Sequence, residues 1–326
     1  MQNISSRIIF IRLLASSLVV MLLFVLSLLY GSAGWSWELE NWSSAIFWEL
    51  RLPRSLMAIL AGTGLALAGF WMQLLFKNPL ASPSVLGVTN GASLGVAFVT
   101  MAAQSIWGYN FPELTLLAAF AGSMAVLLIL AVVRLRLNNL TSLLIFGVML
   151  GHLAGALETI FQRAAARNDL PNLIYWSMGS FSKVTMIQVL WLGLSLAIVI
   201  FIVVRNHRSI DIFSFGEHIA VSMSISPSKV SNVLIFCSGL LTAVITAFCG
   251  PIAFIGLAAP HLAKLWWPFR TQLKLIPAVA ITGMVIALFC DVLARFLDLP
   301  INAITSLIGA PWVMWWLYQN KTQRHG

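Results

Sequence analysis

The sequence predicts an all-α protein that crosses a membrane many times. Hydrophobic residues make up 60% of the 326-residue chain, charged residues only 9%, and the mean hydropathy is +0.93. Soluble domains carry about 25% charged residues, so most of this chain cannot face water. The long apolar runs show no alternation of apolar and polar residues, which predicts spanning helices instead of a barrel, because only these two structures satisfy the backbone in lipid.

Ten apolar segments are candidates for membrane-spanning helices, each of which needs about 20 mostly apolar residues. The first follows Arg7 and Arg12 and is long for the core of a signal peptide, so we expect it to be a retained helix. The eighth is interrupted by Pro251, Gly256 and Pro260, and such a broken helix needs protein or water to satisfy its backbone. The ten expected spans are residues 8–30, 55–76, 85–103, 114–133, 141–162, 186–204, 230–249, 251–267, 275–294 and 301–318.

An even number of spans places both termini on the same side of the membrane. With the N-terminus inside, thirteen of the 19 Lys and Arg residues fall on the inner side, as the positive-inside rule requires. The net charge of +9 is therefore mainly a topology signal, and nucleic-acid binding explains it poorly. The six basic residues expected on the outer side are Arg51, Arg54, Arg163, Arg167, Lys183 and Arg295.

We expect residues 1–326 to form a single transmembrane domain. The longest polar connection on the inner side, at about 206–228, is expected to hold one or two short helices. The sequence contains no nucleotide-binding loop of the form G-x-x-x-x-G-K-[ST]. If ATP drives this protein, a separate chain must bind the nucleotide.

Two sets of glycines repeat at intervals of four residues. Such faces let helix backbones approach closely in lipid, so tight packing is the first interpretation and a pore-lining surface is the second. Glu158 lies eleven residues after Gly147 and returns to nearly the same helix face. Ionisable residues within spans mark pathways or structural partners, and we keep both roles open for Glu158. The sets are Gly87, Gly91 and Gly95, and Gly147, Gly151 and Gly155; the second set with Glu158 forms the candidate translocation pathway.

No metal site or cofactor is expected from the remaining polar residues. Asp291 and Arg295 are four residues apart at the outer end of the ninth span and form a predicted ion pair. His152 and His261 lack the spacing of metal ligands. The cysteines lack the spacing of a disulfide framework or metal site and are expected to be buried and inert: Cys237, Cys249 and Cys290.

Three stretches together resemble one family, the FecCD permeases of type II ABC importers. The resemblance covers almost the whole chain, and three long motifs in order are far more specific than any one of them. The first runs from Arg51-Leu-Pro-Arg54-Ser55 through Ala66-Leu-Ala-Gly69 and Gln73 to Asn78-Pro-Leu-Ala-Ser-Pro83, Leu86-Gly87 and Asn90-Gly-Ala92. The second is Gly250-Pro-Ile-Ala-Phe-Ile-Gly256-Leu-Ala-Ala-Pro-His261, and the third is Asp291-Val-Leu-Ala-Arg295 followed by Leu299-Pro300, Thr305 and Ile308-Gly-Ala-Pro311.

The resemblance implies the fold and the partners of an importer. It implies ten helices per subunit, two permease copies with the pathway between them, two ATPase subunits on the cytoplasmic side and a periplasmic substrate-binding protein. It places the chain in the cell inner membrane with both termini cytoplasmic, and it implies that the chain is no enzyme, since ATP is hydrolysed by the partner. A homodimer is expected over a heterodimer with a second permease.

The resemblance also implies functional residues at two ends of the molecule. Arg51, Arg54 and Arg295 match the family's outer arginines, which pair with acidic residues of the binding protein; helix-end arginines reaching the lipid headgroups are the alternative. The inner loop resembles the family's ATPase-coupling segment, with the candidate residues Asp211, Gly216, Glu217 and Ala220.

Three places depart from the family pattern, one of which is Lys264, where arginine is common. Met223-Ser224 stands where members often have Leu-Gly, and a missing glycine changes the available turns. Asn302 replaces the glycine of the Leu-Pro-x-Gly stretch, and asparagine tolerates left-handed backbone geometry.

The expected function is the import of a bulky metal chelate by alternating access, coupled to ATP. Iron–siderophore is the leading substrate because it is the commonest in the family, and cobalamin and haem are the alternatives. An ion-coupled secondary transporter would require intramembrane carboxylates or ion sites in broken helices, and only Glu158 and Asp291 are acids within spans. A membrane-embedded enzyme is disfavoured because the His and acidic residues show no catalytic spacing.

Overall fold

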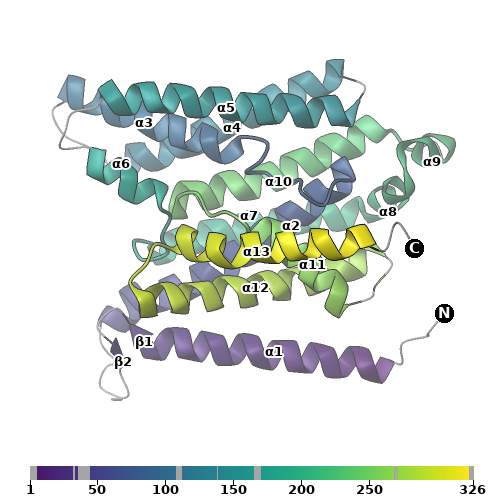
Figure 1. Ribbon diagram of the computed structural model, residues 1–326, viewed down its shortest axis with the longest axis horizontal. Helices are drawn as coiled ribbons and strands as arrows, with labels where there is room; N and C mark the ends of the chain where they lie inside the picture. The colour runs from purple at the N-terminus through teal and green to yellow at the C-terminus, as the bar shows by residue number, and fades with distance from the viewer. Residues whose placement is uncertain are drawn as a thin grey trace.

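The computed structural model describes residues 6–31, 34–35, 45–107, 112–137, 139–164, 170–267, 269 and 271–322. These residues are almost entirely helical, and the long helices run side by side along one direction (Figure 1). The strands within this part are the short antiparallel pair β1 (Tyr30–Gly31) and β2 (Gly34–Trp35). A π-helical turn, Phe47–Arg51, leads into α2. The α-helices are α1 (Ser6–Leu29), α2 (Leu52–Phe76), α3 (Val88–Trp107), α4 (Pro112–Arg136), α5 (Leu140–Ala164), α6 (Leu170–Ser177), α7 (Met186–Arg205), α8 (His207–Phe215), α9 (Glu217–Ser222), α10 (Pro227–Cys249), α11 (Ile255–Trp266), α12 (Gln272–Leu297) and α13 (Ile301–Thr322).

The predicted all-α, polytopic fold is confirmed. Each of the ten expected spans corresponds to one helix, namely α1 to α5, α7 and α10 to α13. Within the described residues, seven helices are long and apolar enough to cross a membrane, counting the π-helical turn and α2 as one. Helices α3 and α13 have shorter apolar stretches, Val88–Ala102 and Ile301–Trp315. Helices α8 and α9 confirm the short helices expected at about 206–228, whereas α6 was not expected.

The eighth expected span, residues 251–267, is wrong in its first part. The chain leaves α10 at Gly250 and stays outside helical geometry until α11 begins at Ile255. Helix α11 has 12 residues, which is about 18 Å and only about half of the hydrocarbon core. Gln73 of α2 donates from Nε2 to the carbonyls of Gly256 at 3.4 Å and Leu257 at 3.3 Å, in the first turn of α11. Pro260 has no N–H for the Gly256 carbonyl, so a neighbouring helix supplies a donor there.

Asn302 stabilises the same interruption in a way that the sequence did not predict. It lies in the first turn of α13 and does not have a positive φ. The left-handed geometry that asparagine tolerates therefore does not occur at this position. Its Oδ1 instead accepts the Ala253 N–H at 3.1 Å, and its own N–H donates to the Met178 carbonyl at 3.3 Å. A glycine could not make the side-chain bond, so here the departure from the family pattern adds a contact.

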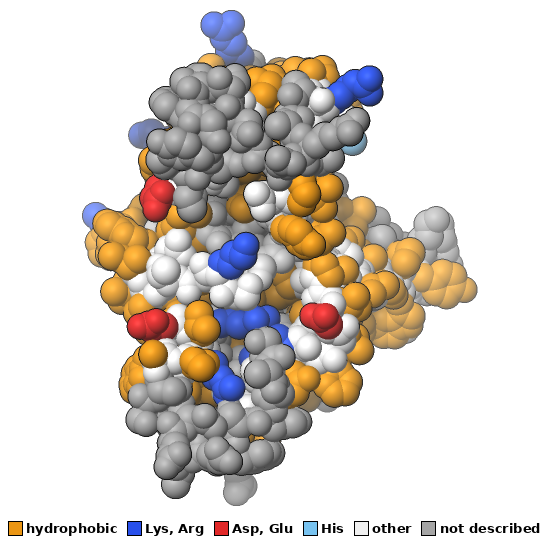
Figure 2. Space-filling model, turned by 90° about the vertical axis from the view of Figure 1, so that its left-hand side faces the viewer, with side chains coloured by type: hydrophobic (Ala, Val, Ile, Leu, Met, Phe, Trp, Pro, Cys, Tyr) orange, Lys and Arg blue, Asp and Glu red, His pale blue; other side chains and the backbone are white. Residues whose placement is uncertain are grey.

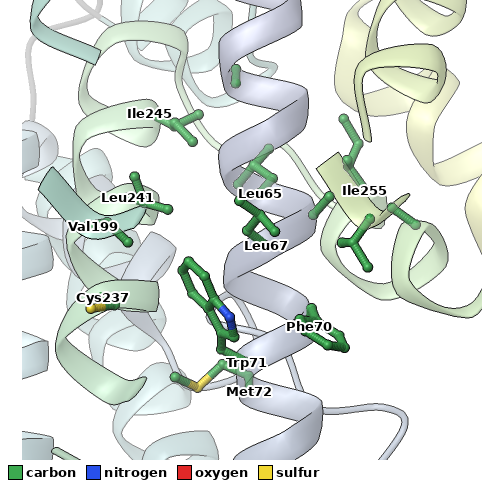
Figure 3. Close-up of a cluster of buried hydrophobic side chains, with 14 of the residues drawn as sticks. Leu65, Leu67, Phe70, Trp71, Met72, Val199, Cys237, Leu241, Ile245 and Ile255 are labelled. Atoms are coloured by element: carbon green, nitrogen blue, oxygen red, sulfur yellow. The ribbon is translucent and has the colours of Figure 1, made fainter. Parts of the chain in front are cut away.

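Helix α2 occupies the centre of the bundle. Its side chains Leu65, Leu67 and Trp71 are buried, and Figure 3 shows α2 side chains between those of α7 and α10 on one side and α11 on the other. Helix α12 packs along α2, and α1 lies outside α12, while α3, α4 and α5 form the opposite flank (Figure 1). The most buried helix is therefore the one that carries the first family motif.

Backbone contact at glycine holds neighbouring helices together. A Cβ on Gly62 of α2 would overlap the carbonyl oxygen of Gly283 on α12, and a Cβ on Gly283 would overlap that of Gly62. Gly91 of α3 and Gly122 of α4 are related in the same way. Lipid supplies no hydrophobic force between helices, so close packing of small residues is what associates them.

The two ends of the bundle carry different features. Helices α8 and α9, the start of α1 and the last turns of α13 lie at one end, and β1, β2 and the C-terminal end of α12 lie at the other (Figure 1). We call these the inner and the outer end, following the charge distribution along the chain. Arg167, Arg270 and Arg324, which the charge distribution included, lie outside the described residues.

The contact between α2 and α12 predicts the effect of one added methyl group. Gly283→Ala forces the two helices apart, and we expect a loss of about 1–3 kcal/mol of stability from overpacking. Thermal unfolding in detergent measures it. Gly193→Ala is the matched control, because a Cβ there would meet only Leu60 Cδ1 at 3.7 Å, and a better helix former is expected to be neutral or stabilising. Equal midpoints for both variants would contradict the contact.

Candidate functional site

A buried carboxylate organises the outer end of the bundle. Asp291 of α12 has a side chain that is 1% exposed, and it lies between two arginines. Its Oδ1 accepts hydrogen bonds from Arg54 Nε at 3.0 Å and Arg54 Nη2 at 2.9 Å, and its Oδ2 accepts one from Arg295 Nη2 at 2.6 Å. The predicted pair of Asp291 and Arg295 is present, and the structure adds Arg54 from α2, which is 237 positions away in the chain.

Arg295 is committed to its own chain. Its Nε donates to the Asp291 carbonyl at 3.4 Å, Nη1 donates to the carbonyls of Ser27 at 2.8 Å and of Tyr30, and Nη2 donates to Ser27 Oγ at 2.6 Å as well as to Asp291. These bonds engage all five guanidinium N–H groups. The side chain is 4% exposed. Arg295 therefore fastens α1 to α12, and the geometry does not favour it as a group that meets another protein.

Arg54 and Arg51 are placed differently from Arg295. Arg54 is 18% exposed, and its Nη1 makes no hydrogen bond to any described residue. Arg51 is half-buried, donates from Nη1 to the Leu28 carbonyl at 3.2 Å and lies against Gly31. Figure 2 shows the outer end, where Lys and Arg side chains gather near the centre of the face. Three arginines against one aspartate leave this cluster with a formal charge of +2.

Hydroxyl groups connect the arginine cluster to α1. Ser27 Oγ and Ser55 Oγ are 2.7 Å apart, and both residues are fully buried. Ser55 follows Arg54 directly, so the first turn of α2 reaches both Asp291 and Ser27. Sequence reasoning missed Ser27, because a serine in an apolar run carries no signal until its partner is known.

The inner end is built from α8 and α9, and its exposed tip is apolar. Phe215, Ile219, Val221 and Met223 are all exposed there. The polar loop that the sequence suggested thus presents large apolar side chains, which commonly mark interaction surfaces. Among the candidate coupling residues, Ala220 is fully buried and cannot contact a partner in this conformation.

The remaining candidate coupling residues contact this chain. Asp211 Oδ1 accepts the Gln272 N–H at 2.8 Å, and Glu217 Oε1 lies 3.4 Å from Arg134 Nη2. Gly216 joins α8 to α9 with φ +139°, a conformation that L side chains rarely adopt. The two carboxylates thus tie the inner segment to two different helices, α12 and α4.

The missing glycine at position 224 does not remove the turn. Ser224 itself takes a left-handed conformation with φ +59°. Its N–H donates to the Val221 carbonyl at 2.9 Å, and the Ile225 N–H donates to the Ala220 carbonyl at 2.8 Å, which closes the end of α9. The family's turn is kept at a cost of about 1–2 kcal/mol for the left-handed serine.

The glycines of α5 pack inside the subunit. Gly151 lies against the backbone of Gly87, which has φ +82°, and Asn90 Nδ2 donates to the Gly151 carbonyl at 2.9 Å. Gly147 lies against Leu86. The structure therefore favours packing over pore lining at Gly147 and Gly151. Sequence reasoning missed the contribution of Asn90.

The rest of α5 leaves an apolar surface uncovered in this chain. Glu158 is half-buried, and Gln162 Nε2 donates to its Oε1 at 2.9 Å. Gly155 has open space around it, because a Cβ added there would meet only Asn90 Nδ2, at 3.9 Å. The exposed apolar residues of this helix include Met149, Leu153 and Ile160.

A cavity of about 360 Å³ lies between α11, α12 and α13. Phe254, Ile286, Ile308 and Trp312 are among the residues that line it, and the wall is almost wholly apolar. Within the described residues there is no group of three or more His, Cys, Asp and Glu side chains that could hold a metal ion. The three cysteines are buried and unpaired by disulfides.

Comparison with known proteins places this geometry in a family. The family model of the FecCD transport family matches residues 8–319. The vitamin B12 import system permease protein BtuC of Serratia proteamaculans is 36% identical over 321 residues, covering 96% of this chain and 94% of that protein. The BtuC protein of Yersinia pseudotuberculosis is 37% identical over 319 residues, covering 94% and 92%.

Solved structures agree with the fold. An ABC transporter described as being of the metal-chelate type, in an inward-facing conformation, matches with a TM-score of 0.82 and 28% identity over 94% of this chain and 98% of that one. The PsaBC complex of Streptococcus pneumoniae matches with a TM-score of 0.55 and 13% identity over 83% and 91%, a likeness in fold alone.

The arginine cluster predicts that replacing Asp291 lowers the stability of the protein much more than replacing Asp298. Asp291→Asn removes the negative charge that lies between Arg54 and Arg295. We expect a loss of about 3 kcal/mol of stability, because an arginine is left buried without its counter-charge. Unfolding of the purified chain in detergent measures it. Asp298→Asn is the matched control, since Asp298 is exposed and asparagine tolerates its φ of +52°. Similar small shifts for both variants would show that the cluster contributes little.

Proposed function

The chain belongs to the FecCD transport family, and on that premise we propose that it is the inner-membrane permease of an ATP-binding-cassette importer for a bulky metal chelate. The observation that carries the proposal is the match over almost the full length to permeases of a vitamin B12 import system. The positions of the three family motifs also support the proposal: the first runs along the central helix, the second includes the broken helix and the third includes the arginine cluster. The chain itself makes and breaks no bonds.

Cobalamin is the substrate that the relatives favour. The curated relatives named above import vitamin B12, whereas the expectation of an iron–siderophore rested only on its frequency in the family. The structural neighbour of the metal-chelate type supports a ferric chelate as the second candidate. Both are large molecules.

The partners follow from the two ends of the bundle. Two ATPase subunits bind at the inner end, where α8 and α9 expose Phe215, Ile219, Val221 and Met223. A periplasmic binding protein docks at the outer end, over the positive arginine cluster. A second copy of this chain completes the pathway, and the exposed apolar face of α5 is a surface that such a copy can cover.

This arrangement requires both termini to be cytoplasmic. The start of α1 and the last turns of α13 lie at the same end as α8 and α9 (Figure 1). The excess of basic residues on that side of the membrane supports the same orientation.

Transport proceeds by alternating access. ATP binding at the inner end and a docked, loaded binding protein at the outer end each stabilise one arrangement of the two permeases. A ligand can drive such a change only by binding one state more tightly than the other. The two sites are therefore coupled, and the coupling is reciprocal.

Reconstitution tests the substrate assignment. The chain, its ATPase and its binding protein are placed in proteoliposomes and offered labelled cobalamin, ferric siderophore and haem in parallel. We expect accumulation of cobalamin that depends on ATP and on the binding protein. Proteoliposomes with an ATPase subunit unable to hydrolyse ATP are the control. Accumulation of the siderophore alone would move the substrate to the second candidate, and accumulation without ATP would contradict the importer.

Charge reversal at the outer end tests docking. Arg51→Glu is expected to weaken binding-protein affinity about tenfold, as for the loss of one charge-assisted hydrogen bond, and more strongly as salt is lowered. Arg51 is preferred to Arg54 and Arg295, whose replacement also breaks contacts with Asp291. Arg163→Glu, an equal charge reversal in the last turn of α5, is the control, because that side chain is exposed and lies outside the arginine cluster. Unchanged affinity in Arg51→Glu would remove the docking role.

A further inference from the structure

Helix α12 connects the two functional ends of the bundle. It contains 26 residues, which corresponds to about 39 Å at 1.5 Å per residue and is long enough to cross the hydrocarbon core. Its C-terminal half carries Asp291 and Arg295, which hold α2 and α1. Its middle is in backbone contact with α2 through Gly283 and Gly62. One continuous helix thus joins the inner end of the bundle to the arginine cluster.

The first turn of α12 depends on another helix for its cap. Thr271 occupies the N-cap position and makes no side-chain capping bond. The N–H of Gln272 instead donates to Asp211 Oδ1 of α8 at 2.8 Å. A carboxylate here also faces the positive end of the helix dipole. The cap that a helix ordinarily obtains from its own chain neighbour is supplied here from 61 positions away.

The same turn lacks one internal hydrogen bond. Pro277 lies inside α12 and has no N–H to donate to the preceding turn. The Leu275 N–H donates to the Thr271 carbonyl at 3.3 Å, and the bond from Asp211 adds to this internal contact at the start of α12. Helix α8 packs against α12 in the same region.

The second carboxylate of the inner segment, Glu217, holds its partner more weakly than Asp211 does. Glu217 lies 3.4 Å from Arg134 Nη2 and is 36% exposed, and pairs that are open to water contribute little. Arg134 is 6% exposed and also donates from Nη1 to the Leu137 carbonyl at 2.7 Å. Glu217 connects α9 to α4 and does not touch α12.

We propose that Asp211 is a positioning residue of the transport cycle, which transmits movement of α8 to α12 by holding the first turn of α12. The inference rests on the proposed function, since it requires an ATPase that moves α8 and α9. The ATPase contacts the exposed apolar tip, and Asp211 faces inward and acts on α12 through its hydrogen bond to Gln272. This assigns Asp211 a role distinct from that of a contact residue for the ATPase.

The experiment compares Asp211→Ala with Asp211→Asn in proteoliposomes. Asparagine keeps the Oδ1 acceptor and loses the charge, whereas alanine loses both. The measured quantity is the ratio of substrate imported to ATP hydrolysed. We expect this ratio to fall about tenfold in Asp211→Ala, within the usual range of allosteric coupling, and to be restored within about threefold in Asp211→Asn.

Glu217→Ala removes the other carboxylate of the same segment without touching α12, and it reports the effect of losing charge near the ATPase. A ratio in Asp211→Asn as low as in Asp211→Ala would overturn the proposal, since the effect would then follow the charge instead of the hydrogen bond. So would an unchanged ratio in Asp211→Ala.

Hydrogen exchange supplies a measurement that does not depend on transport. In the purified chain, Asp211→Ala should raise amide exchange in the first turn of α12 relative to wild type and to Glu217→Ala. Unchanged exchange there would show that Asp211 does not hold this turn. This readout also separates the proposed function from the role of Asp211. A wild-type protein without ATP-driven uptake contradicts the proposed function, whereas normal uptake with no change in Asp211→Ala contradicts only the role of Asp211.

Discussion

Direct contact between helix backbones is the constraint on which this structure depends. Within lipid, apolar side chains gain nothing by leaving the solvent, so helices associate through close packing and polar contacts. Gly62 and Gly283 bring α2 and α12 together, and Gly91 and Gly122 do the same for α3 and α4. The contact between α2 and α12 also decides which polar groups can meet, since it brings the start of α2 beside the end of α12.

The polar contacts at the two ends follow from that packing. Asp291 can accept bonds from Arg54 of α2, as well as from Arg295 of its own helix, because α2 and α12 are already adjacent. At the inner end, Asp211 reaches the first turn of α12 because α8 packs there. Both aspartates therefore hold α12 in place. In the proposed function, this helix connects the end that binds the ATPase to the end that binds the substrate-binding protein.

Much of the fold could be predicted from the sequence, because the bilayer makes hydropathy and length direct guides to helices. The failures lie where a contact between distant segments overrides a local pattern. The first part of the eighth span is not helical, and its Ala253 N–H donates to the side chain of Asn302, 49 positions away. Motif position alone did not indicate that Arg295 binds α1 or that Ala220 is buried, and their roles toward partner proteins stay predictions.

The sequence by itself determined the ten apolar segments, the expected orientation and the family, because apolar length, basic residues and motif order are properties of the chain alone. Tertiary structure decided which glycines contact which backbone and which arginine keeps an exposed edge. It also decided that the inner tip is apolar, with Phe215 and Met223 exposed. These features depend on which surfaces remain exposed after the helices pack. A hydrogen bond between residues 237 positions apart, such as Arg54 and Asp291, leaves no signal in the local sequence.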